Sequence, residues 1–118
     1  MKLPFEAYML RIFIGESDKA GGTPLYEVIV KEARKRGMAG ATVLRGFLGF
    51  GANSRIHTSK VLRLSEDLPL VVEIVDAEDK IEEFMPYLDT IIDEGLITME
   101  KVRVIAYRHN LKDNAGEE

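Results

Sequence analysis

Apolar and polar side chains alternate in the segment "YMLRIFI" (residues 8–14), and this period of two predicts a β-strand. Side chains two positions apart share a face of a strand. One predicted face therefore carries Tyr8, Leu10, Ile12 and Ile14, and the other carries Met9, Arg11 and Phe13.

Two later segments repeat their apolar residues every three or four positions, which predicts amphipathic helices. The first helix is expected over residues 24–36, with Thr23 as N-cap, Pro24 at the first helical position and Gly37 as the stop signal. The second is expected to begin at an Asp76 cap, with Asp79 completing an acidic form of the capping box, and to end at Gly95. Its predicted buried stripe is Ile81, Phe84, Met85, Leu88, Ile91 and Ile92. Pro86 should kink this helix or remove one of its hydrogen bonds.

The remaining apolar segments read as strands. They are "ATVLRGFLGF" (41–50), a short strand in "KVLRL" (60–64), "LPLVVEIVD" (68–76) and "LITMEKVRVIAY" (96–107), with a loop over residues 51–60. The order β-α-β-β-α-β predicts an α+β, ferredoxin-like sandwich with two helices on one face of an antiparallel sheet.

The length and composition of the chain indicate a small globular protein and exclude several other classes. The chain has 118 residues, 46% of them hydrophobic and 31% charged, so we expect one globular domain with a core over about 8–106 and a flexible tail over 107–118. Without cysteine, disulfides and thiolate metal sites are excluded. A net charge of −4 argues against nucleic-acid binding. Apolar runs are too short for a membrane span and the N-terminus lacks a signal-peptide pattern, so a cytoplasmic location is expected.

The second face of the predicted sheet is also apolar. We assign to it Met9, Phe13, Val43, Phe47, Val71 and Val75, interrupted only by Arg11, Arg45 and Glu73. A monomer would expose this face to water as a larger apolar patch than monomers normally show. The pattern therefore predicts that the face packs against other copies of the chain, the alternative being a register error that exchanges the two faces.

The segment "GFLGFGANSRIHTSK" (residues 46–60) places glycines, hydroxyls and bases at a predicted strand end. Gly49 and Gly51 would allow positive φ and let a ligand approach the main chain. Arg45 and Arg55 could neutralise phosphate charge, and Asn53, Ser54 and His57 add hydrogen-bonding groups. The alternative is that the glycines only form a bulge and a turn. No Walker loop or dinucleotide fingerprint is present.

Six segments together resemble a known family: "IFIGESDK", "PLYEVIVKEAR", "GATVLRG", "GFGANSRIHT", "LSEDLPLVVEIVD" and "GLITMEKVRVI". The chain is identified over about residues 8–105 as a member of an uncharacterised prokaryotic family, domain of unknown function 190, of the PII-like superfamily. The resemblance implies a homotrimer whose sheets face one another. It also implies an adenine nucleotide (AMP, ADP or ATP) as effector in clefts between subunits.

The resemblance implies that Gly49, Gly51, Asn53 and Glu73 lie at the ligand. With the cationic and polar residues noted above, the predicted site is Arg45, Gly49, Gly51, Asn53, Ser54, Arg55, His57 and Glu73. Asn53 stands where PII-type proteins have glutamine, and Glu73 matches an acidic residue of the third strand. The segment "DEGLITMEKV" lacks the glycine-rich loop that grips phosphates in PII-type proteins, which favours a smaller nucleotide or another anion over ATP.

We therefore expect a PII-like sensor that regulates a protein partner such as a membrane transporter, with no tightly bound cofactor, no nucleic acid and no membrane insertion. One alternative is a metal-responsive trimer of the copper-tolerance type with His57 near a shared axis, although no metal site is predicted within one chain. Another is a purely structural module that binds a partner. An enzyme is not expected, because "GESD" (15–18) reads as a turn and no nucleophile–base pair or acid pair stands out.

Overall fold

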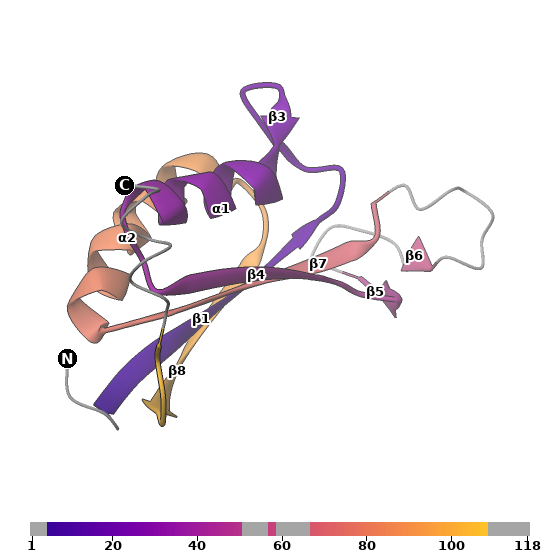
Figure 1. Cartoon of the computed structure of the whole chain (residues 1–118). Helices are drawn as coiled ribbons and strands as arrows, with labels where there is room; N and C mark the ends of the chain where they lie inside the picture. The colour runs from indigo at the N-terminus through magenta and orange to yellow at the C-terminus, as the bar shows by residue number, and fades with distance from the viewer. Residues whose placement is uncertain (1–4, 51–56, 59–66, 109–118) are drawn as a thin grey trace.

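A computed structural model of the chain describes residues 5–50, 57–58 and 67–108 (Figure 1). Four long strands form the main sheet: β1 (Phe5–Gly15), β4 (Gly40–Arg45), β7 (Pro69–Asp76) and β8 (Leu96–Val104). The helices are α1 (Leu25–Lys35) and α2 (Glu78–Ile91). Four two-residue strands complete the description: β2 (Lys19–Ala20), β3 (Thr23–Pro24), β5 (Leu48–Gly49) and β6 (His57–Thr58).

The sheet has the strand order β4-β7-β1-β8, and each neighbouring pair is antiparallel. Both helices lie on one face of this sheet (Figure 1). The predicted α+β, ferredoxin-like arrangement is therefore confirmed. The long first strand also has the predicted faces, since Leu10, Ile12 and Ile14 are buried while Phe13 is exposed.

The hydrophobic core lies between the sheet and the helices. Its fully buried side chains come from β1, β7 and both helices: Leu10, Ile12, Ile29, Val72, Ile74, Ile81, Phe84 and Leu88. The predicted stripe of the second helix is confirmed at Ile81, Phe84 and Leu88, but Met85 is 36% exposed. Burying these aliphatic and aromatic groups is the main force that holds the helices on the sheet.

In β4 the predicted faces were wrong. Val43 lies opposite the fully buried Val72, so it points toward the helices, and Leu44, opposite Val71, takes the open face instead. Arg45 lies opposite the buried Leu70 and is therefore also on the helix side of the sheet. The reason is that "ATVLR" has apolar side chains on both faces, so its apolar pattern alone does not fix which side is covered. Phe47 follows the end of β4 and is 69% exposed.

Three predicted helix boundaries were also wrong. The N-caps are Pro24 and Ala77 instead of Thr23 and Asp76, and neither makes a side-chain capping hydrogen bond. Asp76 is buried, and its carboxylate accepts hydrogen bonds from the backbone N–H groups of Ala39 (2.9 Å) and Ala77 (2.6 Å), which offset the cost of burial. The second helix ends at Ile91, before Gly95.

The predicted stop at Gly37 is confirmed. Gly37 has φ +73°, its N–H donates to the carbonyl of Arg34 (2.9 Å), and the N–H of Met38 donates to that of Ala33 (3.1 Å). This is the hydrogen-bond pattern of a Schellman motif. In α2, Pro86 lies inside a helix that continues through it to Ile91, so the helix accepts the loss of one N–H donor.

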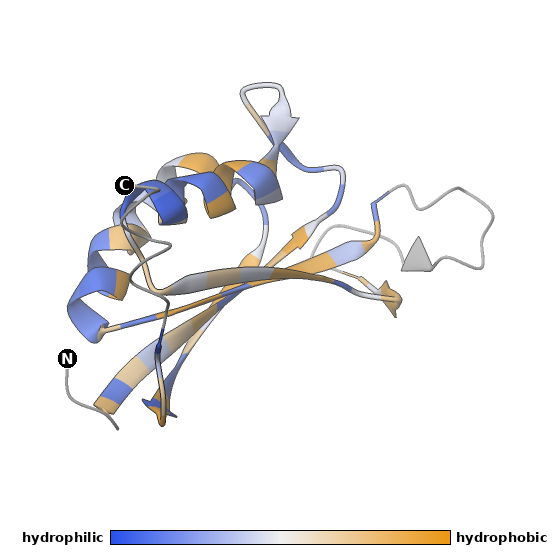
Figure 2. Cartoon of the chain, viewed as in Figure 1, coloured by the Kyte–Doolittle hydropathy of each residue, from blue (hydrophilic) through white to orange (hydrophobic). Residues whose placement is uncertain are grey.

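Beyond β4 the chain forms a ribbon that extends away from the helices (Figure 1). In this ribbon Leu48 pairs with Thr58 and Gly49 pairs with His57, so the prediction of a loop over 51–60 was wrong at residues 57–58. The rest of that loop and the predicted strand at 60–64 lie outside the described residues. In Figure 2 the helices carry much of the hydrophilic colour, whereas the β5 end of the ribbon is hydrophobic.

Candidate functional site

The end of β4 packs closely against the start of β7. Gly46 donates its N–H to the carbonyl of Pro69 (2.6 Å), and a Cβ on Gly46 would lie 2.7 Å from Pro69 Cγ. A Cβ on Gly49 would lie 3.2 Å from the same atom. Both glycines are thus packed against Pro69, and only Gly46 also lies close to its backbone carbonyl. Gly49 does not have the expected positive φ. Among the described residues, the glycines with positive φ are Gly21, Gly22, Gly37 and Gly95.

Arg45, the last residue of β4, forms an ion pair with Glu16. The Arg45 side chain is 57% exposed and that of Glu16 is 21% exposed. Only one carboxylate oxygen takes part: Glu16 Oε2 accepts from Arg45, while Oε1 is buried with no hydrogen-bond partner among the described residues. Arg45 therefore lies at the strand end, as predicted, but its charge is already partly neutralised by a residue 29 positions away.

The loop after β1 holds Glu16 in place through a group of polar contacts. Asp18 Oδ2 accepts from the N–H of Gly15 (3.0 Å), which is the self-bonded turn expected for "GESD". Asp67 Oδ1 accepts from the N–H and the hydroxyl of Ser17 (3.2 and 2.7 Å). Asp67 has φ +66°, and its carboxylate occupies the space where a Cβ on Gly15 would lie. The loop is thus fixed to the start of β7 by side-chain and backbone contacts.

Glu73 lies elsewhere, in the middle of the open sheet face. Arg11 Nε donates to Glu73 Oε2 (3.0 Å) and Arg11 Nη1 donates to Glu100 Oε1 (2.5 Å). These hydrogen bonds, first to Glu73 and then to Glu100, raise the pKa of the Arg11 guanidinium. Glu73 is four residues along β7 from Pro69, a separation of roughly 13 Å in a strand. Within one chain Glu73 is therefore not beside Arg45 and Gly49.

The other predicted site residues are placed only in part. The pairing of β5 with β6 brings the backbones of Gly49 and His57 together at the same end of the molecule as Arg45. Gly51, Asn53, Ser54 and Arg55 lie outside the described residues. The described part of the site is thus a close-packed strand end with one arginine beside it.

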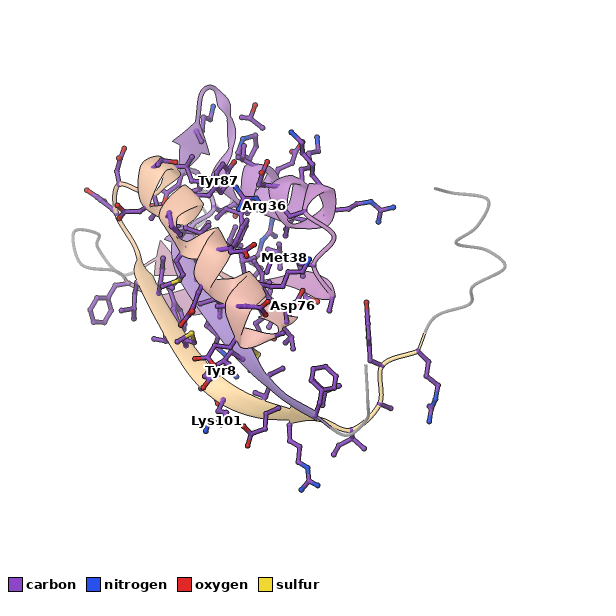
Figure 3. All side chains as sticks on the ribbon, turned by 90° about the vertical axis from the view of Figure 1, so that its left-hand side faces the viewer. Tyr8, Arg36, Met38, Asp76, Tyr87 and Lys101 are labelled. Atoms are coloured by element: carbon purple, nitrogen blue, oxygen red, sulfur yellow. The ribbon has the colours of Figure 1, made fainter. Side chains whose placement is uncertain are left out.

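A separate hollow, missed by the sequence analysis, lies where the end of α1 meets the start of α2. Its volume is about 310 Å³, and it is lined by Arg36, Met38, Lys80 and Glu83. Both of its cations have partners: Arg36 pairs with Glu32 (2.9 Å) and Lys80 donates to the carbonyl of Arg36 (3.4 Å). Figure 3 shows Arg36 beside Tyr87 in this region. The i, i+4 spacing of Glu32 and Arg36 could have predicted their ion pair from the sequence, although not the hollow beside it.

The part of the chain that the structure describes contains neither a metal site nor a membrane-spanning helix. There, no group of three histidine, aspartate or glutamate side chains is arranged to hold a metal ion. No described helix combines the length and the apolar character that crossing a bilayer requires.

Comparison with known families decides the identity of the chain. The model of the DUF190 family, described as Uncharacterized ACR, COG1993, matches residues 7–104. The chain belongs to the DUF190 family. Among its relatives in that family, a UPF0166 protein of Aquifex aeolicus (strain VF5) is 41% identical over 97 residues, which cover 82% of this chain and 91% of the relative. A UPF0166 protein of Methanocaldococcus jannaschii is 35% identical over 100 residues, covering 84% and 92%.

Solved structures relate this DUF190 protein to the PII-like fold. CPII of Thiomonas intermedia K12, a nitrogen regulatory PII-like protein solved with ADP, AMP and bicarbonate, has a TM-score of 0.59 and 15% identity, covering 86% of this chain and 91% of CPII. A PII-like protein of Thermus thermophilus has a TM-score of 0.62 and 16% identity, covering 85% and 90%. At this identity the likeness concerns the fold, so the expected PII-like fold is confirmed.

Proposed function

We propose that this DUF190 protein is a PII-like sensor that assembles as a homotrimer through its open sheet face. In this proposal a small anionic effector, above all an adenine nucleotide, binds in the clefts between protomers and alters docking to a protein partner such as a membrane transporter. The protein acts in the cytoplasm as a regulator without catalysis of its own.

The observation that carries this proposal is the open sheet face. The helices cover one side of the sheet only, and the other side exposes Phe13 (36%), Leu44 (48%) and Leu96 (58%). The register places them with Val71 in one row across the four strands, since Leu44 pairs with Val71, Val71 with Phe13, and Phe13 with Leu96. A continuous apolar surface of this kind is typical of a protein interface, and a second copy of the chain is the occupant we propose.

The face also carries a charged cluster, Glu73–Arg11–Glu100. Its side chains are between 28% and 55% exposed, so it lies in the sheet surface and would be covered by a neighbouring copy. Because the three charges already pair within one protomer, covering them leaves fewer unpaired charges than covering a lone arginine or glutamate would. Any contact of Glu73 with an effector would come from this interface.

Two observations support the effector proposal: the exposed arginine at the end of β4 and the nucleotides bound in a protein of the same fold. Arg45 is largely exposed and can donate to phosphate oxygens. CPII, which shares the fold, has been solved with ADP and AMP. We propose that Gly51, Asn53, Ser54, Arg55 and His57 complete the site around the same ligand.

The proposal is tested by calorimetric titration of the assembled protein with ATP, ADP, AMP and cyclic dinucleotides. We expect heat with at least one adenine nucleotide and a clear loss of affinity in Arg45→Gln. Arg34→Gln is the matched control, because Arg34 is an exposed arginine on α1, away from the strand end. Absence of binding to every nucleotide, or equal losses in both variants, would overturn the nucleotide proposal.

A further inference from the structure

We propose that Glu16 acts as a built-in competitor for the effector, occupying Arg45 until a more highly charged anion displaces it. This inference rests on the proposed function, since it concerns the same arginine. It assigns Glu16 a role that neither the sequence pattern nor the resemblance to PII-type proteins had suggested.

The first argument is that Glu16 is held in position independently of Arg45. Its N–H donates to the carbonyl of Leu68 (2.8 Å), and the preceding residue, Gly15, pairs with Pro69 at the end of β1. Asp18 and Asp67 hold the rest of the loop through the bonds to Gly15 and Ser17. The backbone of Glu16 is therefore fixed by the fold, and its carboxylate is presented to Arg45 whether or not a ligand is there.

The second argument is that the ion pair leaves Arg45 open to a second anion. A guanidinium has five N–H donors, and Glu16 engages it through a single oxygen instead of the bidentate contact that makes such pairs strong. More than half of the Arg45 side chain is exposed, whereas most of Glu16 is covered. An incoming anion can thus reach the exposed side of Arg45 from the solvent, and it displaces Glu16 as it takes over the guanidinium.

The third argument concerns charge. Glu16, Asp18 and Asp67 place three carboxylates in this loop region, and Arg45 is the cation paired with Glu16. A singly charged anion gains little from an arginine that already has a carboxylate partner. A phosphate group with two negative charges gains more, because the Coulomb energy grows with charge. Displacing Glu16 costs each anion the same free energy, so weakly attracted carboxylates and bicarbonate are left with little net gain while a phosphate ester retains one.

The test compares AMP binding to wild-type protein and Glu16→Gln by calorimetry. Removal of the competing charge should tighten AMP binding by about fivefold, the upper range for one exposed ion pair. Acetate, as a singly charged probe, should gain at least as much as AMP. Glu82→Gln is the control, because it removes one negative charge from an exposed position on α2 and should leave both affinities unchanged.

Further variants separate competition from positioning. In an Arg45→Gln background, the added Glu16→Gln substitution should have no effect, because the two residues act on the same charge. Glu16→Asp, which shortens the side chain and keeps its charge, should tighten AMP binding by less than Glu16→Gln and gives a second reading if Glu16→Gln folds poorly. Unchanged or weaker AMP binding in folded Glu16→Gln would overturn the inference while leaving the nucleotide proposal intact. Absence of binding of AMP, ADP, ATP and cyclic dinucleotides to wild type and variants alike would overturn both.

Discussion

Gly46 shows how a single residue decides where β4 ends. It lies so close to Pro69 that a Cβ would be 2.7 Å from the proline ring and 3.1 Å from the proline carbonyl oxygen. Its φ is not in the left-handed region, so the requirement for glycine here comes from lack of space and not from backbone conformation. The close approach in turn allows the Gly46 N–H to bond to Pro69 and directs the chain into the ribbon.

Replacement of Gly46 by alanine should therefore destabilise the protein. Because one of the clashing atoms belongs to the backbone, the strands must separate, and we expect a loss of about 1–3 kcal/mol in the free energy of unfolding. Urea denaturation followed by circular dichroism measures this loss. Gly40→Ala is the control, since Gly40 begins the same strand and a Cβ there would meet nothing within 4 Å. Similar stabilities for the two variants would show that the strand end adapts easily.

At the scale of elements, Arg36 connects the two helices. It is the C-cap of α1, and its guanidinium lies 5.3 Å from the centroid of Phe84 and 5.0 Å from that of Tyr87, both on α2. It also pairs with Glu32 and donates to the carbonyl of Glu83 (3.3 Å). A cation over two aromatic rings is attracted to them, so Arg36 stabilises the contact between α1 and α2.

The surroundings of Tyr87, on the same helix contact, predict a loss of stability at alkaline pH. Burial, and then the charge of Glu32, raise the pKa of Tyr87 above its ordinary value of 10.0, although Arg36 opposes the shift. In this pH range the unfolded chain releases the proton first, so the folded state loses stability as the pH rises above 10.0. Spectrophotometric titration should show Tyr87 ionising at a higher pH than a normal tyrosine. The substitution Tyr87→Phe should make the decline of Tm at alkaline pH less steep. An equally steep decline in Tyr87→Phe would contradict this account.

For the whole molecule, the sequence was sufficient for the fold but not for the site. The alternation in 8–14 and the helical periods identified β1, α1 and α2, because each is a local pattern with one buried face. In β4 the pattern failed, since Val43 and Leu44 are adjacent apolar residues on opposite faces. The ion pairs of Arg45 with Glu16 and of Arg11 with Glu100 join residues 29 and 89 positions apart, and no local pattern encodes such contacts.

The open sheet face leads to a prediction about the assembled molecule. Phe13 on β1 and Met85 on α2 are both 36% exposed apolar side chains, but Phe13 lies on the open sheet face and Met85 on a helix that covers the other face. If copies associate through the sheets, Phe13→Lys places three charges in the buried interface of a trimer and should dissociate it, because a buried unpaired charge costs several kcal/mol. Met85→Lys should leave the assembly unchanged. Sedimentation equilibrium at micromolar concentration gives the mass of each variant. A monomeric wild type would contradict the assembly itself, and dissociation by Met85→Lys alone would place the contact between copies on the helix side.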